Sequence, residues 1–236
     1  MQDYNVFVIN LDSATERWKY YENKGWNRWA ATHYNDLPDD DPIFKEMVSM
    51  WNIPPEEHNA KCACYISHTA LWEHIIKNDL KNVLVLEDDA YQINELPNID
   101  DLPTDSLTYF GGITYNNRLT DGPLSVDLDE GLNNIDYSKY RMIMLLSYFI
   151  PNRRVAYKML QSARERGRPR AIDVMVKYSH INHYLYYPAI FVEKPMQSQI
   201  RNKKVRFSDS KYNSVKSQEV MQEIKFFEEE KNKLFK

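Results

Sequence analysis

The stretch Val83-Leu84-Val85-Leu86-Glu87-Asp88-Asp89 decides the fold class, because an uninterrupted apolar run ends abruptly in three carboxylates. A strand this apolar is typical of the interior of a sheet that is covered on both faces. Ligands of open α/β sheets bind at the carboxyl ends of such strands, where these acids are expected to lie. The stretch therefore predicts an α/β protein whose functional site contains Glu87, Asp88 and Asp89.

The acidic triplet also indicates a bound cation, because three neighbouring carboxylates repel one another in its absence. Hard oxygen ligands favour Mg²⁺ or Mn²⁺, and an ion held by few side chains keeps coordination positions open for phosphate oxygens. The pattern therefore points to a metal-bound diphosphate. For the triplet taken alone, a solvated acidic turn at the end of an edge strand is the alternative.

The composition argues against a general affinity for polyanions. Lys and Arg number 30, Asp and Glu number 34, and the net charge is −4, so no overall field attracts nucleic acid or an anionic membrane. The start lacks a signal-peptide pattern, and no apolar run approaches the roughly 20 residues of a transmembrane segment. We expect a cytoplasmic protein (in the host cytoplasm if it is viral) or one peripheral to a membrane. The oligomeric state stays open.

The two cysteines, Cys62 and Cys64, are separated by one residue, a spacing that rarely suits a disulfide. With His68 and His74 they form a candidate zinc set, although structural zinc sites usually space their cysteines more widely. Buried thiols in a reducing compartment are the favoured interpretation.

Local patterns predict strands and helices along most of the chain. Strands are expected near residues 6–9, 28–31, 83–86, 107–110, 142–150, 185–188 and 190–192. Helices are expected over residues 13–25, where Ser13 and Glu16 suggest a capping box, and over 60–78, 155–163 and from 171 onward. A long loop is expected over 116–140. The pair Gly111-Gly112 is expected to permit close approach of a ligand or a neighbouring segment.

The domain organisation predicted is one domain over residues 1–212, followed by an amphipathic helix over 213–236. That helix is expected to pack on its own domain rather than to recruit a partner. Four arginines form a cluster in the sequence: Arg164, Arg166, Arg168 and Arg170. The cluster is either a solvated basic turn or a contact for phosphate or acceptor. His180 and His183 form a further, weak metal candidate.

Three segments of the chain form a recognisable set. The first is Val8-Ile9-Asn10-Leu11-Asp12 with Arg17 downstream. The second begins with Cys64-Tyr65-Ile66-Ser67-His68-Thr69-Ala70-Leu71-Trp72-Glu73 and continues through Leu84-Val85-Leu86-Glu87-Asp88-Asp89-Ala90, and the third is Ile172-Asp173-Val174-Met175 before Tyr187-Pro188. In order and spacing over roughly residues 6–201 they resemble glycosyltransferase family 25, the lipooligosaccharide-type galactosyltransferases and their collagen-modifying relatives.

The resemblance implies a GT-A fold, a three-layer α/β/α sandwich with a mostly parallel central sheet that binds a nucleotide sugar. It implies an inverting transfer of a hexose, such as galactose or glucose, from a UDP-sugar to a glycan or other hydroxyl acceptor. Mn²⁺ or Mg²⁺ would bridge the donor diphosphate. The short chain, without a transmembrane or retention signal, looks more like a free-standing bacterial or large-virus enzyme of glycan or lipopolysaccharide biosynthesis than a secretory-pathway one.

Roles on the donor side follow from the resemblance. Asp89 is assigned as the leading metal ligand, Asp88 as a second or water-mediated ligand, and Glu87 as a contact to the donor ribose or sugar. Residues expected to line the nucleotide pocket are Asn10, Leu11 and Arg17.

On the acceptor side, Asp173 is the candidate base, because inversion requires a base on the face opposite the leaving group. Its position at the head of a helix favours an ionised carboxylate, and an ordinary helix N-cap is the alternative. His68 is interpreted as a structural histidine with satisfied ring nitrogens.

Departures from the family leave the sugar unspecified. Cys62-Ala63-Cys64 replaces a stretch that usually begins with glycine, and Asp12-Ser13-Ala14 lacks the basic residues frequent after the opening strand. Two other functions stay open for this sequence. One is a metal-dependent nuclease or phosphohydrolase, and the other is a noncatalytic module that binds nucleotide sugars.

Overall fold

The structure of the protein is a computed structural model, which describes residues 3–37, 55–112, 114–116, 128–137, 140–165 and 171–193. The predicted helix over 213–236 and the members of the arginine cluster after residue 164 lie outside these ranges. Most of the loop predicted over 116–140 does so too.

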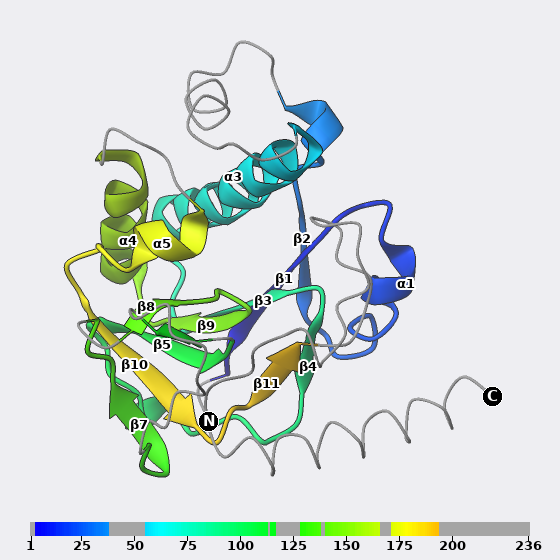
Figure 1. The fold of residues 1–236 in the computed structure, drawn as a ribbon. Coiled ribbons are helices and arrows are strands. Elements are labelled where there is room, and N and C mark those ends of the chain that lie inside the picture. The colour runs from blue at the N-terminus through cyan, green and yellow to red at the C-terminus, as the bar shows by residue number, and fades with distance from the viewer. Residues whose placement is uncertain are drawn as a thin grey trace.

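A seven-stranded sheet forms the centre of the molecule (Figure 1). In order across the sheet, its strands are β2 (Asn27–Ala30), β1 (Asn5–Asn10), β3 (Val83–Glu87), β9 (Ser147–Ile150), β5 (Ser106–Gly111), β10 (Asn182–Tyr187) and β7 (Gly131–Asn134). The pairs β1–β2, β1–β3 and β5–β10 are parallel, whereas β9 and β7 run antiparallel to their neighbours. This mostly parallel sheet with its helices confirms the predicted GT-A-like α/β fold.

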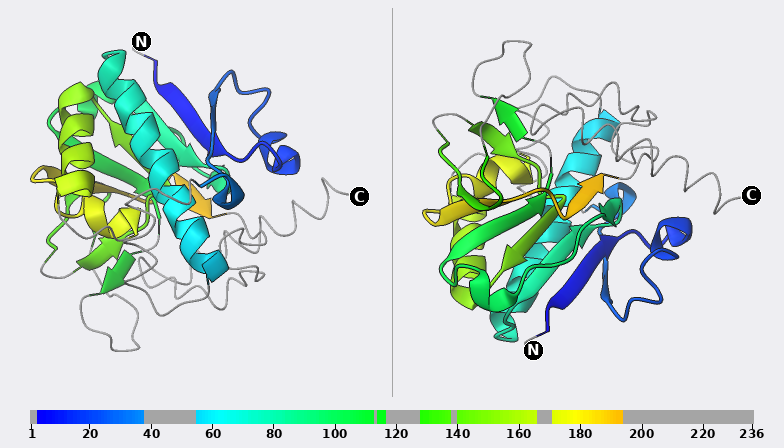
Figure 2. Two further views of the ribbon diagram at one scale, coloured as in Figure 1. Left: turned by 90° about the horizontal axis from the view of Figure 1, so that it is seen from above. Right: turned by 90° about the horizontal axis from the view of Figure 1, so that it is seen from below.

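One face of the sheet is covered by three helices, α3 (Pro55–Lys77), α4 (Arg153–Glu165) and α5 (Ile172–Val176) (Figure 2). Leu71, Trp72 and Ile75 of α3 are completely buried in the core between helices and sheet, and Met159 of α4 joins them. Burying a large apolar side chain contributes roughly 1.5–3 kcal/mol. The apolar spacing along α3 therefore fixes this helix over β1 and β3.

The opposite face is covered by shorter elements. They are α1 (Thr15–Trp18) with the turns after it, η2 (Ile99–Asp101) and a two-stranded sheet of β4 (Ala90–Gln92) and β11 (Phe191–Glu193). Tyr21, Phe110, Phe149 and Phe191 are buried in this second core. The three predicted layers are thus present, and in the described part of the chain the second outer layer is built from two short helices and two strands.

The remaining described elements pack against the helices α3 and α5. They are η1 (Tyr34–Asp36) and the antiparallel pair β6 (Thr114–Asn116) and β8 (Tyr140–Ile143). Among the described helices, none combines the length and the apolarity needed to cross a bilayer.

Several local predictions differ from the structure. The helix expected over residues 13–25 is only α1, whose N-cap is Ala14 without a side-chain hydrogen bond, so the capping box is not formed. The apolar run 142–150 is divided between β8 and β9. Within the segment predicted to be a loop, residues 131–134 form β7, because the backbone of β10 supplies the hydrogen bonds that this polar segment needs.

The prediction for Gly111 and Gly112 is confirmed. A Cβ atom at Gly111 would lie 1.9 Å from the carbonyl oxygen of Phe191, and one at Gly112 would lie 2.4 Å from that of Met144. Gly112 also has a φ of +124°, which side chains rarely permit. The absence of a side chain therefore allows β5 to pass directly against β11.

Candidate active site

The carboxyl ends of β1 and β3 meet at one edge of the sheet, because the two strands are parallel neighbours with Ile9 opposite Glu87. Residues 83–86 are completely buried, as predicted for an interior strand. After Glu87 the chain turns through Asp88 and Asp89 into β4. The acidic triplet and Asn10 are therefore brought to the same edge.

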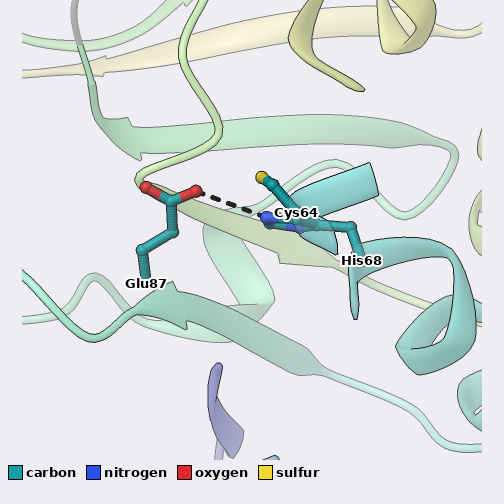
Figure 3. Close-up of side chains that lie close together, drawn as sticks. All are labelled: Cys64, His68 and Glu87. Carbon is teal, nitrogen blue, oxygen red and sulfur yellow. Dashed lines mark hydrogen bonds and ion pairs between the residues drawn. The ribbon is translucent and has the colours of Figure 1, made fainter. Parts of the chain in front are cut away.

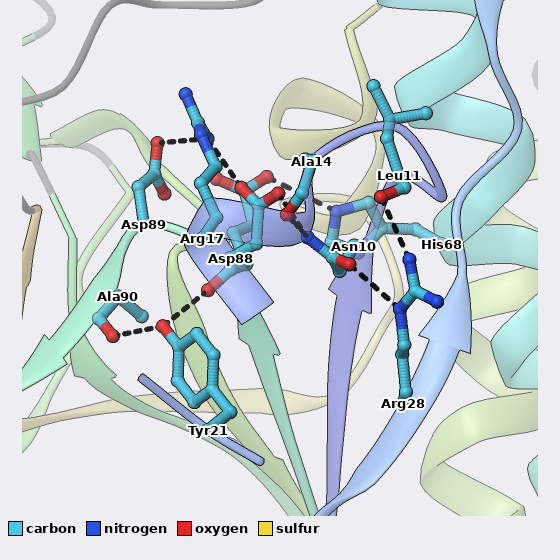
Figure 4. A network of polar contacts seen from close by, with 11 residues as sticks. Asn10, Leu11, Ala14, Arg17, Tyr21, Arg28, His68, Asp88, Asp89 and Ala90 are labelled. Atoms are coloured by element: carbon cyan, nitrogen blue, oxygen red, sulfur yellow. Dashed lines mark hydrogen bonds and ion pairs between the residues drawn. The ribbon is translucent and has the colours of Figure 1, made fainter. Parts of the chain in front are cut away.

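Asp88 is the centre of a buried polar network (Figure 4). Its Oδ1 lies 2.5 Å from Arg17 Nη1, and its Oδ2 accepts a hydrogen bond of 2.9 Å from Asn10 Nδ2. Arg17 is only 7% exposed and Asp88 only 8%. Three predicted site residues thus come together, and both oxygens of Asp88 already have protein partners.

Asp89 is placed differently from Asp88. Its Oδ2 lies 3.6 Å from Arg17 Nη1, whereas its Oδ1 is buried and has no hydrogen-bond partner within the described ranges. Burial raises the pKa of Asp89 well above its usual value, and the charges of Glu87 and Asp88 raise it further. A buried carboxylate oxygen without a partner requires an explanation, and binding of a cation at this position would satisfy it. Asp89 therefore fits the predicted role of metal ligand.

Glu87 faces α3, where its Oε1 lies 3.3 Å from His68 Nε2. Burial raises the pKa of Glu87 well above its usual value, followed by the charges of Asp173 and Asp88, while Arg17 lowers it. The carboxylate is partly exposed, at 28% for the side chain. It is therefore available to a ligand at the edge of the sheet, as a contact to the donor requires.

His68 is held by a chain of buried hydrogen bonds. Trp72 Nε1 donates to the Tyr148 hydroxyl oxygen at 2.9 Å, and this hydroxyl lies 2.8 Å from His68 Nδ1. Because the tyrosine oxygen accepts from Trp72, its own proton is available to Nδ1, which leaves the histidine proton on Nε2, directed at Glu87. Burial lowers the pKa of His68 to about 4. The residue is a neutral, satisfied histidine, as interpreted from the sequence.

Asp173 lies in the first turn of α5, but it does not cap that helix. The N-cap residue is Ala171, and Asp173 Oδ1 accepts a hydrogen bond of 2.7 Å from the backbone N–H of Leu145. Burial raises the pKa of Asp173, and the Leu145 hydrogen bond and His68 oppose that shift. The charge of Asp173 in turn raises the pKa of Glu87. Asp173 therefore acts electrostatically on Glu87 although it comes from a distant segment.

Two further residues border this neighbourhood, and of these only Glu193 was missed by sequence reasoning. Glu193 ends β11 opposite Ala90, and its charge raises the pKa of both Glu87 and Asp89. In the sequence, Glu193 directly follows the apolar residues of a predicted strand, as the acidic triplet does. Cys64 lies one helical turn before His68, and its thiol faces the same carboxylate, Glu87.

The other residues predicted to lie at the site make mainly structural contacts. The carbonyl oxygen of Leu11 accepts a hydrogen bond of 2.9 Å from Arg28, which also donates to Asn10 Oδ1 at 2.8 Å. Arg164, the described member of the arginine cluster, forms an ion pair with Glu73 of α3.

The pair His180 and His183 does not form a metal site in the described structure. His183 is buried and contacts the hydroxyl groups of Tyr109, Tyr137 and Ser179, whereas His180 is exposed. His183 is thus a core histidine.

The charges at this edge are unbalanced. The charges of Asp88 and Glu193 raise the pKa of both Glu87 and Asp89, Asp173 also raises that of Glu87, and Glu87 that of Asp89. Arg17 contributes a single positive charge, which stabilises the ionised forms of Glu87 and Asp89. Such an arrangement favours binding of an additional cation.

The family comparison agrees with this geometry. The model of glycosyltransferase family 25, described as an LPS biosynthesis protein family, matches residues 3–111. No curated protein matches the chain. The matched segment contains β1, α3, β3 and the acidic triplet, whereas Asp173 lies beyond it. The match supports the resemblance predicted from the sequence, and over residues 3–111 the chain is similar to glycosyltransferase family 25.

Proposed function

We propose that the protein is an inverting, metal-dependent glycosyltransferase that transfers a hexose from a UDP-sugar to a hydroxyl group of a glycan or similar acceptor. The observation that carries the proposal is the buried, unpartnered Oδ1 of Asp89 at the carboxyl edge of a parallel sheet. It lies among carboxylates whose charge exceeds that of Arg17. The family supports glycosyl transfer as the reaction class.

On the donor side, Asp89 would hold Mn²⁺ or Mg²⁺, since hard carboxylate oxygens suit both ions. The ion, when bound, neutralises the negative charge that develops on the departing diphosphate. Asp88 is better suited to a supporting role, because Arg17 and Asn10 occupy its two oxygens. Asp88 thus positions the turn that carries Asp89, and the second carboxylate oxygen of Glu87, whose Oε1 lies at His68, remains for the ribose or sugar hydroxyls.

On the acceptor side, Asp173 would act as the base. The Leu145 hydrogen bond fixes the orientation of its carboxylate, and burial raises its pKa, which strengthens it as a proton acceptor. Asp173 takes the proton of the acceptor hydroxyl, whose oxygen forms the new bond to the anomeric carbon. The bond from that carbon to the diphosphate oxygen breaks, and the UDP leaves with the bonding electrons.

A saccharide of the lipopolysaccharide type is the acceptor class that the family description suggests. Cys62 and Cys64 are thiols that form no disulfide with each other, which supports a reducing, cytoplasmic location where nucleotide sugars would be the donors. The net charge of −4 gives no support to a nucleic-acid partner.

The experiment that tests the proposal measures UDP release from a panel of UDP-sugars, with Mn²⁺ or with a chelator, in the presence of saccharide acceptors. We expect turnover with one donor, its loss with the chelator, and its loss in Asp89→Asn. Asp36→Asn is the matched control, because Asp36 is an exposed acid in η1. Folding of each variant is checked by circular dichroism.

The same assay separates the alternatives. Hydrolysis of phosphodiesters or nucleic acid without sugar transfer would identify a phosphohydrolase. Donor binding without turnover on any acceptor would identify a noncatalytic module. Metal-independent turnover that survives in Asp89→Asn would overturn the role of Asp89.

A further inference from the structure

A second group of potential ligands lies on the helix side of the acidic edge (Figure 3). Cys64 Sγ, a ring nitrogen of His68 and a carboxylate oxygen of Glu87 all lie within 4.8 Å of one another. Cys64 and His68 are four residues apart on α3 and therefore share a helical face. Glu87 reaches them from the end of β3. The fold thus joins a thiol, an imidazole and a carboxylate from two elements.

This group differs from the zinc set considered from the sequence. Cys62 is buried in a separate cluster with Leu37 and Ala63, and His74 packs against the rings of Phe7 and Trp29. Of the four residues in that zinc set, Cys64 and His68 belong to the group described here, and Glu87 supplies its third ligand atom.

The surroundings of His68 are those of a metal-ligating histidine. Such a histidine is usually fixed through its second ring nitrogen by a neighbouring polar group. Here Tyr148 holds Nδ1, Trp72 holds Tyr148, and Nε2 is left facing Glu87 at 3.3 Å. In the other tautomer of His68 the tyrosine oxygen accepts a hydrogen bond from Nδ1–H, which leaves Nε2 unprotonated and able to bind an ion.

The local charge also favours a cation. Burial raises the pKa of the Cys64 thiol, and the charges of Glu87, Asp173 and Asp89 raise it further. A coordinated thiol is deprotonated outright. A divalent ion would compensate one thiolate and one carboxylate, and so would form a neutral unit in this buried setting.

We propose that Cys64, His68 and Glu87 form a site for a borderline-soft divalent cation such as Zn²⁺, separate from the hard-cation position at Asp89. Thiolate and imidazole select this class of ion over Mg²⁺ or Ca²⁺. Zn²⁺ binds at roughly 2.0–2.3 Å from such ligands, so the three side chains close slightly around it. Three protein ligands leave a fourth position for water. Binding forms the Sγ–metal bond and releases the thiol proton to solvent.

The test uses Co²⁺ as a spectroscopic substitute for Zn²⁺, with the full chain under reducing conditions and without donor. We expect a sulfur-to-cobalt charge-transfer band in the near ultraviolet, which Zn²⁺ displaces. Cys64→Ser should abolish the band, and the matched Cys62→Ala should retain it. Asp89→Asn should also retain the band, which separates this site from the proposed donor metal.

Zinc affinity provides a second readout that does not depend on activity. In competition with a chromophoric chelator, Cys64→Ser and Glu87→Gln should each raise the Zn²⁺ dissociation constant at least tenfold. Tyr148→Phe, which removes the group that holds His68, should raise it about tenfold. Absence of a thiolate band in the wild-type protein, or a band that survives in Cys64→Ser but not in Cys62→Ala, would overturn the proposal. Circular dichroism confirms that each variant is folded.

Discussion

Arg17 and Asp88 form a buried ion pair that connects α1 to the turn after β3, with 2.5 Å between Arg17 Nη1 and Asp88 Oδ1. Asn10 donates to the other oxygen of the same carboxylate. The side chains of Arg17 and Asp88 are 8% and 9% exposed, so water contributes little to their solvation. The pair therefore fixes the turn that carries Asp89, and it is a structural condition for the proposed metal site.

Removal of the arginine should be strongly destabilising. Arg17→Met leaves Asp88 buried without its cation, and loss of one partner of a buried pair costs about 3–5 kcal/mol. Urea denaturation should show a fall of that size in the free energy of unfolding. Lys19→Met is the control, because Lys19 and Glu16 form an exposed pair worth at most about 1 kcal/mol. Equal effects of the two substitutions would contradict the structural role of Arg17.

Gly111→Ala should disturb the contact between β5 and β11. The added Cβ would meet the carbonyl oxygen of Phe191, and relief of this overlap requires a backbone shift that we expect to cost about 3 kcal/mol. Gly25→Ala is the control for backbone strain alone, since nothing lies within 4 Å of a Cβ there although φ is +69°. Thermal unfolding compares the two. If Gly111→Ala loses no more thermal stability than Gly25→Ala, the close approach of Gly111 to the Phe191 backbone is contradicted.

Asp173→Asn tests the proposed base. Asparagine keeps an oxygen that can accept the Leu145 hydrogen bond, but it cannot take a proton. We expect kcat to fall by about 10²–10⁴, with donor KM changed little. A variant that keeps kcat within a few fold of wild type would exclude Asp173 as the base.

The pH dependence of turnover gives a separate check on Asp173. A base is active when ionised, and burial raises the pKa of Asp173. The acidic limb of the kcat profile should therefore lie above the usual aspartate range near 4. A profile that is flat down to that range would contradict the assignment.

The buried histidine His183 should make stability depend on pH. Burial lowers its pKa to about 3, while an unfolded histidine titrates near 6.5. Between these values the unfolded state binds the extra proton, so stability falls as the pH falls. Acidification from pH 7.5 to pH 5 should remove about 2 kcal/mol through this residue.

The corresponding measurement is urea denaturation of the wild type and His183→Asn at both pH values. The variant is expected to be less stable at pH 7.5, because contacts to Tyr109 and Ser179 are lost. The difference in the free energy of unfolding between wild type and variant should be about 2 kcal/mol smaller at pH 5 than at pH 7.5. A gap independent of pH would show that the native histidine is not held neutral.

The parts of the fold that were predictable are those whose signal is local. Residues 83–86 read as an interior strand because every side chain is apolar, and all four are completely buried. The helix around Leu71 and Ile75 was likewise indicated by its spacing and forms α3. Parallel pairing then brought Asn10 to the acidic triplet, as expected for the carboxyl edge of the sheet.

The parts that were not predictable depend on distant partners. The hydrophobic pattern of residues 142–150 does not predict that β9 lies antiparallel between β3 and β5. The polar β7 is a strand only because β10 lies beside it. Similarly, Cys64 and His68 share a helical face in any helix, but their meeting with Glu87 depends on how α3 packs on β3.

The most direct test of the central claim is titration of the protein with UDP by calorimetry, in the presence of Mn²⁺ and in the presence of chelator. We expect UDP to bind in the presence of Mn²⁺, with an affinity that falls at least tenfold with the chelator and at least tenfold in Asp89→Asn, while Asp36→Asn binds as the wild type does. UDP affinity that is the same in wild type and Asp89→Asn, with or without the metal, would contradict the claim that Asp89 holds the cation for a nucleotide donor.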